Sequence, residues 1–321
     1  PRRGIVLNPG TEPAIPPVAG LADTPYWTNR DVAALTELPE SLLVLGAGPV
    51  GCELAQVFAR FGARVVLAET SPRLLPSSEP EASDALTGAL RDDGIEVHTA
   101  ATVQQVSHDG QFTAHLDTGE VITTQRLLVA TGRRTDLVAL GVGAAGMDDT
   151  GNTISVDEQM RAAPDVWAVG DVTGHGAFTH TSVYQARIAA DALLGRDSNG
   201  ADYRAAPAVT FTDPEIATIG YTEATARQHG YEVRTATQPL PRSARGFIHK
   251  AGNDGVVKLI ADVDRGILIG GTVAGPAGGE IAGALAVAIH TEASISLLRR
   301  MIFAYPTFHR AIEDALDTLE L

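Results

Sequence analysis

Short apolar runs alternate with amphipathic stretches through the middle of the chain. Leu42–Leu45 is apolar, a glycine-rich turn follows it, and a helical pattern then extends to Arg60. A second apolar run, Val65–Ala68, precedes a helical stretch near Glu81–Asp93, and a third run lies at Ile95–His98. Strands that alternate with helices predict a parallel sheet with helices packed on it.

The regions before and after this pattern differ from it. Residues 1–38 are rich in proline and turn residues, and only Gly4–Leu7 predicts a short buried strand there. Two further strands, near Phe112–Leu116 and Gln125–Val129, are expected to flank the turn at Thr118-Gly119.

The last third has a third pattern. After a helix at about Ser182–Leu194, strands are expected at Val256–Ala261 and Ile267–Val273, with a hairpin loop between them. Helices are expected at Glu280–His290 and Ile295–Met301. This order predicts an α+β domain with an antiparallel sheet.

Composition narrows the possible partners. The net charge of −15 argues against a nucleic-acid partner and against binding to an anionic membrane surface. No apolar run approaches the ~18 residues that a membrane span needs. The single cysteine, Cys52, excludes an internal disulfide framework and fits a cytoplasmic location. A lone cysteine in an apolar helix is usually a small buried hydrophobe, so no redox role is expected for it.

A dinucleotide motif follows the first apolar run. Gly46-x-Gly48-x-x-Gly51 lies between a predicted strand and a predicted helix, where glycines let the backbone approach a pyrophosphate. Glu69 ends the next strand, where a carboxylate can bind the adenosine ribose hydroxyls. Because a 2′-phosphate would meet this carboxylate, the pattern favours NAD over NADP, although Arg64 and Arg73 lie close in sequence and weaken that preference.

Further motifs on both sides resemble the class I pyridine nucleotide–disulfide oxidoreductases, which include dihydrolipoamide dehydrogenase, glutathione reductase and mercuric reductase. Seven landmarks occur in the family's order: the segment Ile5–Pro13, the glycine motif after Leu38-Pro39-Glu40-Ser41, Leu128–Arg134, Val166–Asp171, Thr179-His180, Thr210–Ala217 and Tyr305-Pro306-Thr307. The resemblance covers the whole chain. It implies a Rossmann-like NAD(P)-binding domain inserted into a partial FAD-binding domain, followed by a C-terminal α+β dimerisation domain.

The resemblance also implies cofactor-binding residues. For NAD(P) they are Gly46, Gly48, Pro49, Val50, Gly51, Glu69, Val103 and Gly132, and for FAD they are Gly10, Arg133, Gly170, Asp171, Thr179 and His180. Alternatives remain open for three positions. A strand-end Asp171 can cap the next turn instead, and His180 can be an ordinary surface or core histidine. Glu53 is implied to lie near the nicotinamide, but it can instead complement the dipole of its helix.

The resemblance implies domain limits and a missing segment. The expected parts are a remnant of the FAD-binding domain (1–38), the NAD(P)-binding domain (39–152), a return segment of the FAD-binding domain (153–205) and the dimerisation domain (206–321). The family's first FAD-binding motif and its C-x4-C redox dithiol are not in this chain. A fragment of a longer protein explains this better than a second chain that supplies the rest.

The C-terminal motif departs from the disulfide-reducing members. Tyr305 replaces their base histidine and Arg310 replaces the glutamate that orients it. Because a tyrosine titrates near pH 10, it is a poor base at neutral pH, and mercuric reductases resemble this chain in using a tyrosine. The neighbouring His309 and Glu313 offer a displaced relay, or simply a solvated helix pair.

Together with the dinucleotide motif, the resemblance implies a flavoprotein oxidoreductase that passes hydride from NAD(P)H to FAD and on to an acceptor. Tyr305 and Glu53 are its expected catalytic residues in this chain, and a homodimer through the C-terminal domain is expected from the resemblance. The acceptor is expected to be a small molecule or a metal ion, as in mercuric reductase, with quinone or disulfide reduction as alternatives. A different alternative is an NAD(H)-binding, dimerising module without flavin or activity. The nine histidines are scattered, so no resident metal site is predicted.

Overall fold

The computed structural model describes residues 4–196 and 199–320, and it divides into two compact units. Unit 1 is Pro1–Ala14 with Arg133–Tyr203, and unit 2 is Ile15–Gly132 with Arg204–Leu321. These boundaries differ from the expected domain limits after residues 38 and 152. Residues 15–38 belong to unit 2 because Leu21 is buried in the same core as Val106, and Trp27 forms a bridge with Leu128.

A parallel sheet forms the first part of unit 2, as the alternating pattern predicted. Its strand order is β5-β4-β3-β9, and every pairing in it is parallel. The central β3 packs entirely apolar side chains from Leu42 onward, so both faces need cover. The elements of this part are η1 (Leu21–Asp23), α1 (Asn29–Val32), β3 (Ser41–Leu45), α2 (Pro49–Arg60), β4 (Arg64–Ala68), α3 (Pro80–Asp92), β5 (Glu96–His98) and β9 (Arg126–Val129).

A small antiparallel sheet lies between β5 and β9 in the chain. It comprises β6 (Val103–His108), β7 (Phe112–Leu116) and β8 (Val121–Thr124). The expectation that the turn at Thr118-Gly119 joins the strand at 112–116 to the strand at 125–129 is wrong. The turn leads into β8, and the chain then enters the parallel sheet as β9. β8 is a separate strand, since its four residues alternate between exposed and buried positions and pair with β7.

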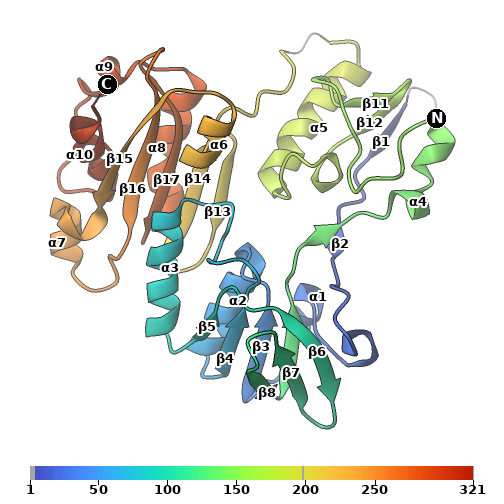
Figure 1. Cartoon of the computed structure of the whole chain (residues 1–321). Helices are drawn as coiled ribbons and strands as arrows, with labels where there is room; N and C mark the ends of the chain where they lie inside the picture. The colour runs from blue at the N-terminus through green and yellow to red at the C-terminus, as the bar shows by residue number, and fades with distance from the viewer. Residues whose placement is uncertain (1–3, 197–198, 321) are drawn as a thin grey trace. The chain divides into compact units, whose positions relative to one another are not determined.

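The C-terminal part of unit 2 is an antiparallel sheet covered by helices (Figure 1), which confirms the α+β prediction. Val257 and Leu259 pack with the helices α8 and α10 on one face, whereas Val256 and Ala274 join the core of the parallel-sheet part on the other. The elements are β13 (Pro207–Thr210), β14 (Glu215–Gly220), α6 (Glu223–Gln228), β15 (Val233–Pro239), η4 (Leu240–Arg242), α7 (Ala244–His249), β16 (Val256–Asp262), β17 (Ile267–Gly275), α8 (Gly278–His290), α9 (Ile295–Leu298), η5 (Phe308–Arg310) and α10 (Ala311–Thr318).

Unit 1 is smaller. It holds a three-stranded sheet of order β1-β12-β11 and a two-stranded pair, β10 with β2. The expectation that Gly4–Leu7 is buried is wrong: Ile5 and Val6 are 43% and 47% exposed. Among the strands of the described residues, β1 lies at the edge of its sheet and pairs with β12 alone. The elements are β1 (Ile5–Leu7), β2 (Glu12–Pro13), β10 (Arg133–Arg134), α4 (Leu137–Leu140), η2 (Val142–Ala145), β11 (Arg161–Ala163), β12 (Val166–Ala168), η3 (Asp171–Thr173) and α5 (Thr179–Leu193).

Neither unit offers a membrane-crossing segment in its described residues: none of their helices is both long enough and apolar enough to span a bilayer.

Candidate functional site

The glycine motif forms the turn between β3 and α2, and its three glycines have different reasons to be glycine. A Cβ at Gly46 would lie 2.6 Å from the carbonyl oxygen of Ala130, and a Cβ at Gly51 would lie 1.9 Å from the carbonyl oxygen of Gly46. A Cβ at Gly48 would meet no protein atom within 4 Å. Packing of the protein therefore explains Gly46 and Gly51, whereas Gly48 faces open space that a ligand can approach.

The N-terminus of α2 presents unsatisfied donors beside Gly48. Gly48 is the N-cap of this 12-residue helix, no side chain caps it, and Pro49 occupies the first helical position. Among the described residues, the N–H groups of Val50 and Gly51 have no hydrogen-bond partner. Free N–H groups and the positive end of the helix dipole bind phosphates, so the turn fits a dinucleotide pyrophosphate.

Glu69 follows β4 and is bonded to this turn. Its Oε2 accepts a hydrogen bond of 2.7 Å from the Ala47 N–H, and its Oε1 accepts one of 2.8 Å from the Ser71 N–H. Burial raises the pKa of Glu69, but the N–H groups of Ala47 and Ser71 outweigh this effect, so the pKa lies below its ordinary value. The carboxylate is therefore ionised at neutral pH. Among the described residues its Oε2 accepts one hydrogen bond, so a lone pair is available to a ligand hydroxyl.

The two arginines that weakened the preference for NAD are engaged elsewhere. Arg64 begins β4, at the opposite end of that strand from Glu69, and donates to the carbonyl oxygen of Thr123 at 2.6 Å. Arg73 donates to the carbonyl oxygens of Pro76 and Ser78 at 2.7 and 2.5 Å. Both guanidinium groups thus donate to backbone carbonyl oxygens.

Two other residues expected to bind NAD(P) differ in what they can offer. The Val103 side chain is 7% exposed and packs in the core with Val106, so only its backbone can contact a nucleotide. Gly132 has a φ of +121°, and a Cβ there would meet no atom within 4 Å. Both assignments stay predictions.

Unit 1 brings together three sequence landmarks that lie far apart in the chain. Thr11 Oγ1 donates to Asp171 Oδ2 at 2.8 Å, and the Arg133 guanidinium lies 3.6 Å from the same oxygen. Arg133 also donates to Thr11, to both its hydroxyl and its carbonyl oxygen. Among the described residues, Asp171 Oδ1 accepts no hydrogen bond, so it fits a hydroxyl of the flavin's ribityl chain.

Gln185, which belongs to no recognisable sequence motif, supports the loop that carries Asp171. This fully buried side chain accepts from the Gly170 N–H at 2.6 Å and donates to Thr173 Oγ1 at 2.9 Å and to the Tyr203 hydroxyl at 2.8 Å. A glutamine inside an otherwise ordinary helix carries no motif, so only the fold reveals it.

The remaining residues expected to bind FAD lie on the surface of unit 1. Gly10 has a φ of +70° and open space where a Cβ would lie. Thr179 begins α5, a 15-residue helix whose N-terminus has no side-chain cap, and both Thr179 and His180 are exposed. His180 stacks on Phe178 with ring centres 5.1 Å apart. These positions are compatible with a flavin and remain predictions.

Glu53 makes a contact that the sequence did not indicate. Its Oε1 accepts the Phe211 N–H at 2.8 Å, just after β13. Gln56, one turn further along α2, exchanges two hydrogen bonds with the backbone of Asp213. This face of α2 therefore binds the β13–β14 loop, and a nicotinamide role for Glu53 remains a prediction.

The C-terminal motif is exposed. Tyr305 is 70% exposed, and the Arg310 guanidinium lies 5.7 Å from the centre of its ring. The displaced relay is not formed: Glu313 pairs with Arg310 at 2.7 Å, and His309 packs against Phe303 with ring centres 5.4 Å apart. Arginine competes better for the carboxylate because it is always charged.

Cys52 is fully buried, and its thiol donates to the carbonyl oxygen of Ala47 at 3.3 Å. Burial, together with the nearby carboxylates of Glu69 and Glu53, raises the pKa of the thiol far above its ordinary value. This raised pKa disfavours the thiolate that redox chemistry requires. The described residues include no group of three or more His, Cys, Asp or Glu side chains arranged to hold a metal ion.

Comparison with known proteins matches two family models. Residues 3–186 match the pyridine nucleotide-disulphide oxidoreductase model, and residues 206–316 match the dimerisation domain of the same family. Mercuric reductase from Acidithiobacillus ferrooxidans is 36% identical over 315 residues, which are 96% of this chain and 56% of that protein. Mercuric reductase from Streptomyces lividans is 36% identical over 320 residues, which are 98% of this chain and 67% of that protein. The chain thus spans between about half and two thirds of the length of the curated relatives it matches.

Solved structures give the same result. The HOCl-induced flavoprotein disulfide reductase RclA from Escherichia coli superposes with a TM-score of 0.87 at 29% identity, over 99% of this chain and 74% of that one. LpdA from Mycobacterium tuberculosis superposes with a TM-score of 0.86 at 25% identity, over 98% of this chain and 69% of that one.

Proposed function

Since this chain belongs to the pyridine nucleotide-disulphide oxidoreductase family, we propose that it contributes the NAD(P)H site, part of the FAD site and the dimerisation domain to a mercuric-reductase-like enzyme. The open space at Gly48, beside the free N–H groups of α2 and the ionised Glu69, is the observation that carries the proposal. FAD, when bound, accepts hydride from the nicotinamide and passes electrons to the acceptor.

In this proposal, different residues of the chain bind the two cofactors. In unit 2, Gly48 and Val50 receive the pyrophosphate of NAD(P)H while Glu69 binds the ribose. In unit 1, Asp171 is oriented by Thr11 and Arg133 toward a flavin hydroxyl. Tyr305 is the residue of this chain that contacts the acceptor, and its 70% exposure leaves the hydroxyl accessible.

The proposed donor is NADH rather than NADPH. The extra phosphate of NADPH would lie beside the Glu69 carboxylate, and Arg64 and Arg73 are bonded to backbone carbonyls. Each negative charge of that phosphate, at ~4 Å from the Glu69 carboxylate in water, is repelled by about 1 kcal/mol. With about two such charges, NADH should bind about tenfold or more tightly than NADPH. Titration of the chain with each nucleotide measures the ratio, and equal affinities would refute this assignment.

Mercuric ion is the proposed acceptor, because the chain is 36% identical to two mercuric reductases and has Tyr305 in place of a base histidine. The test is NADH oxidation by the complete natural polypeptide with Hg(II), a quinone, lipoamide or glutathione disulfide as acceptor. Oxidation that depends on Hg(II) supports the proposal. Rapid turnover of lipoamide or glutathione disulfide would refute it, and a colourless protein that binds NADH would favour a nucleotide-binding module without flavin.

The proposed assembly is a homodimer formed through residues 206–316, the part that matches the dimerisation-domain model. Light scattering with size-exclusion chromatography tests it, and a monomer at micromolar concentration would contradict it. A cytoplasmic location is proposed with it, on the grounds of the single, buried Cys52.

A further inference from the structure

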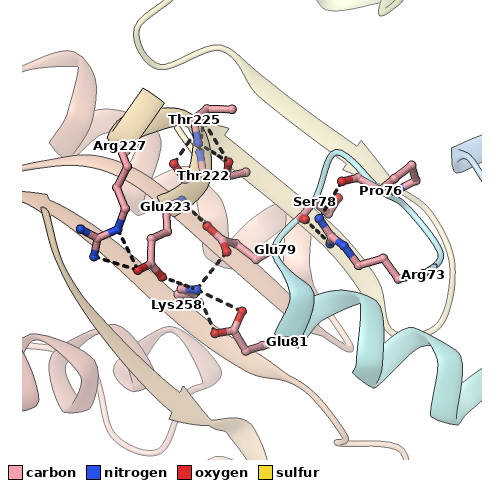
Figure 2. Close-up of polar contacts among 10 residues, drawn as sticks. All are labelled: Arg73, Pro76, Ser78, Glu79, Glu81, Thr222, Glu223, Thr225, Arg227 and Lys258. Atoms are coloured by element: carbon pink, nitrogen blue, oxygen red, sulfur yellow. Dashed lines mark hydrogen bonds and ion pairs between the residues drawn. The ribbon is translucent and has the colours of Figure 1, made fainter. Parts of the chain in front are cut away.

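A lysine in the C-terminal sheet lies among three carboxylates (Figure 2). Lys258, in the middle of β16, places its Nζ 2.9 Å from Glu79, 2.8 Å from Glu81 and 3.0 Å from Glu223. The side chains of Lys258 and Glu79 are only 5% and 2% exposed. A buried pair of this kind stays charged only while both partners are present.

Charge balance inside the cluster favours the ionised lysine. Burial by itself lowers the pKa of Lys258, but hydrogen bonds to Glu81, Glu79 and Glu223 outweigh burial and raise the pKa. The hydrogen bond from Lys258 lowers the pKa of Glu223 in turn. Arg227, on the outer side of the cluster, pairs with Glu223 at 2.9 Å.

Glu79 ends the loop that begins at the ribose-binding residue. Residues 70–78 connect Glu69 to Glu79, the N-cap of α3. Inside the loop, Arg73 donates to the carbonyl oxygens of Pro76 and Ser78 (Figure 2), and Leu75 is 1% exposed. The loop is therefore internally braced, and its far end is fixed where Glu79 meets the C-terminal sheet.

Two contacts fix that far end. Glu79 Oε2 pairs with Lys258, and its Oε1 accepts the Glu223 N–H at 2.6 Å. The Glu79 carboxylate is shielded from water, since its side chain is only 2% exposed. Loss of the lysine would leave this carboxylate buried without a counter-ion, which drives it to move or to take up a proton.

The middle of the same loop touches the glycine turn. The Leu75 N–H donates to the carbonyl oxygen of Ala47 at 2.9 Å. The N–H of Ala47 donates in turn to Glu69 Oε2 at 2.7 Å. Both backbone polar groups of Ala47, in the Gly46–Gly51 turn, are thus bonded to the segment that runs from Glu69 to Glu79.

We propose that Lys258 is a positioning residue for the dinucleotide site. Through Glu79 it fixes the 70–79 loop, and the Leu75 N–H of that loop fixes Ala47 in the turn that receives the pyrophosphate. A strand of the C-terminal sheet thereby sets the affinity of the Rossmann part for NADH. The inference rests on the proposed binding of NADH at Gly48 and Glu69.

The experiment measures NADH binding by the 321-residue chain and its variants, with thermal unfolding as a second reading. Lys258→Met removes the charge at similar length, and Glu79→Gln removes the loop's charge while Gln can still accept the Glu223 N–H. Arg227→Gln is the matched control, because it also removes one cation from the network but leaves the Lys258–Glu79 pair intact. Lys258→Arg retains the charge and tests rescue.

The expected result is a Kd for NADH raised at least about fivefold in Lys258→Met and Glu79→Gln, a change within about twofold in Arg227→Gln, and partial recovery in Lys258→Arg. Hydrogen exchange at the Leu75 amide should accelerate in the first two variants, since its bond to Ala47 depends on the loop. Glu79→Gln keeps Lys258 paired with Glu81 and Glu223, so it remains informative if Lys258→Met does not fold.

Folded Glu79→Gln or Lys258→Met protein that melts earlier but binds NADH with wild-type affinity would overturn the inference and leave the cluster with a purely structural role. Wild-type chain that binds no NADH would instead refute the proposed function. The two failures are therefore distinguishable.

Discussion

Replacing Gly48 with alanine separates nucleotide binding from protein stability. Gly48 has φ −71° and ψ −178°, an extended conformation that alanine adopts without strain. The added methyl group would meet no protein atom within 4 Å. The free energy of unfolding should therefore change by less than about 1 kcal/mol, mostly from the poorer N-cap preference of alanine.

Binding should respond very differently. The methyl group would lie where the pyrophosphate must approach the N–H groups of Val50 and Gly51. A hydrogen bond to a charged group contributes about 1.5–3 kcal/mol, so loss of even one raises the Kd for NADH at least about tenfold. Isothermal titration with NADH, paired with a thermal melt of each protein, measures both quantities.

Gly51→Ala is the matched contrast. Its Cβ would lie 1.9 Å from the carbonyl oxygen of Gly46, so the turn itself must move. This variant should lose several kcal/mol of stability as well as binding, as overpacked positions do (~1–3 kcal/mol or more). Wild-type affinity for NADH in a folded Gly48→Ala protein would refute the assignment of the turn to the pyrophosphate.

Three further predictions concern other parts of the two sites. Gln185→Met should leave the Gly170 N–H without a partner, which costs about 1–3 kcal/mol. The flavin-to-protein absorbance ratio of the complete natural polypeptide should therefore fall, and Gln185→Glu should recover part of it. Unchanged flavin content in Gln185→Met would contradict the supporting role. Tyr305→Phe keeps the ring beside Arg310 but removes the hydroxyl. Hg(II)-dependent NADH oxidation should therefore drop about tenfold while quinone reduction persists. Equal losses with both acceptors would argue against a contact with the metal ion. Because folding lowers the pKa of Glu69, its contribution to stability is complete above the ordinary pKa of 4.5 and disappears as the pH falls through the folded pKa. Acid unfolding followed by circular dichroism should therefore be less steep in Glu69→Gln. Identical pH profiles of the two proteins would show that Glu69 contributes nothing.

Local patterns were sufficient for the dinucleotide motif. A glycine turn at this spacing between a strand and a helix is typical of dinucleotide-binding proteins. The apolar runs at 42–45 and 65–68 predicted β3 and β4 nearly to the residue. The parallel sheet and the C-terminal antiparallel sheet followed from the same patterns. Strand β8 was missed because a four-residue segment with alternating burial leaves too weak a periodic signal.

The polar contacts between distant segments could not be predicted. Arg73 was a candidate to bind a 2′-phosphate until the fold showed its guanidinium on the carbonyl oxygens of Pro76 and Ser78. His309 and Glu313 have the spacing of a helix pair, yet Glu313 binds Arg310. In each case several partners lie within reach along the sequence, and the choice among them depends on three-dimensional geometry.

The sequence by itself determined the family, the order of the nucleotide-binding elements and the position of the glycine turn, because these depend on short-range periodicity and on the backbone freedom of glycine. Only the tertiary structure decided which side chains hold that turn in place. Glu79 and Lys258 are 179 residues apart in the chain, and their 2.9 Å contact exists because the core that buries Leu74 also buries Val256 of β16. Burial makes such a pair obligatory, since a charge removed from water requires a partner, and no local pattern indicates which distant residue will supply it.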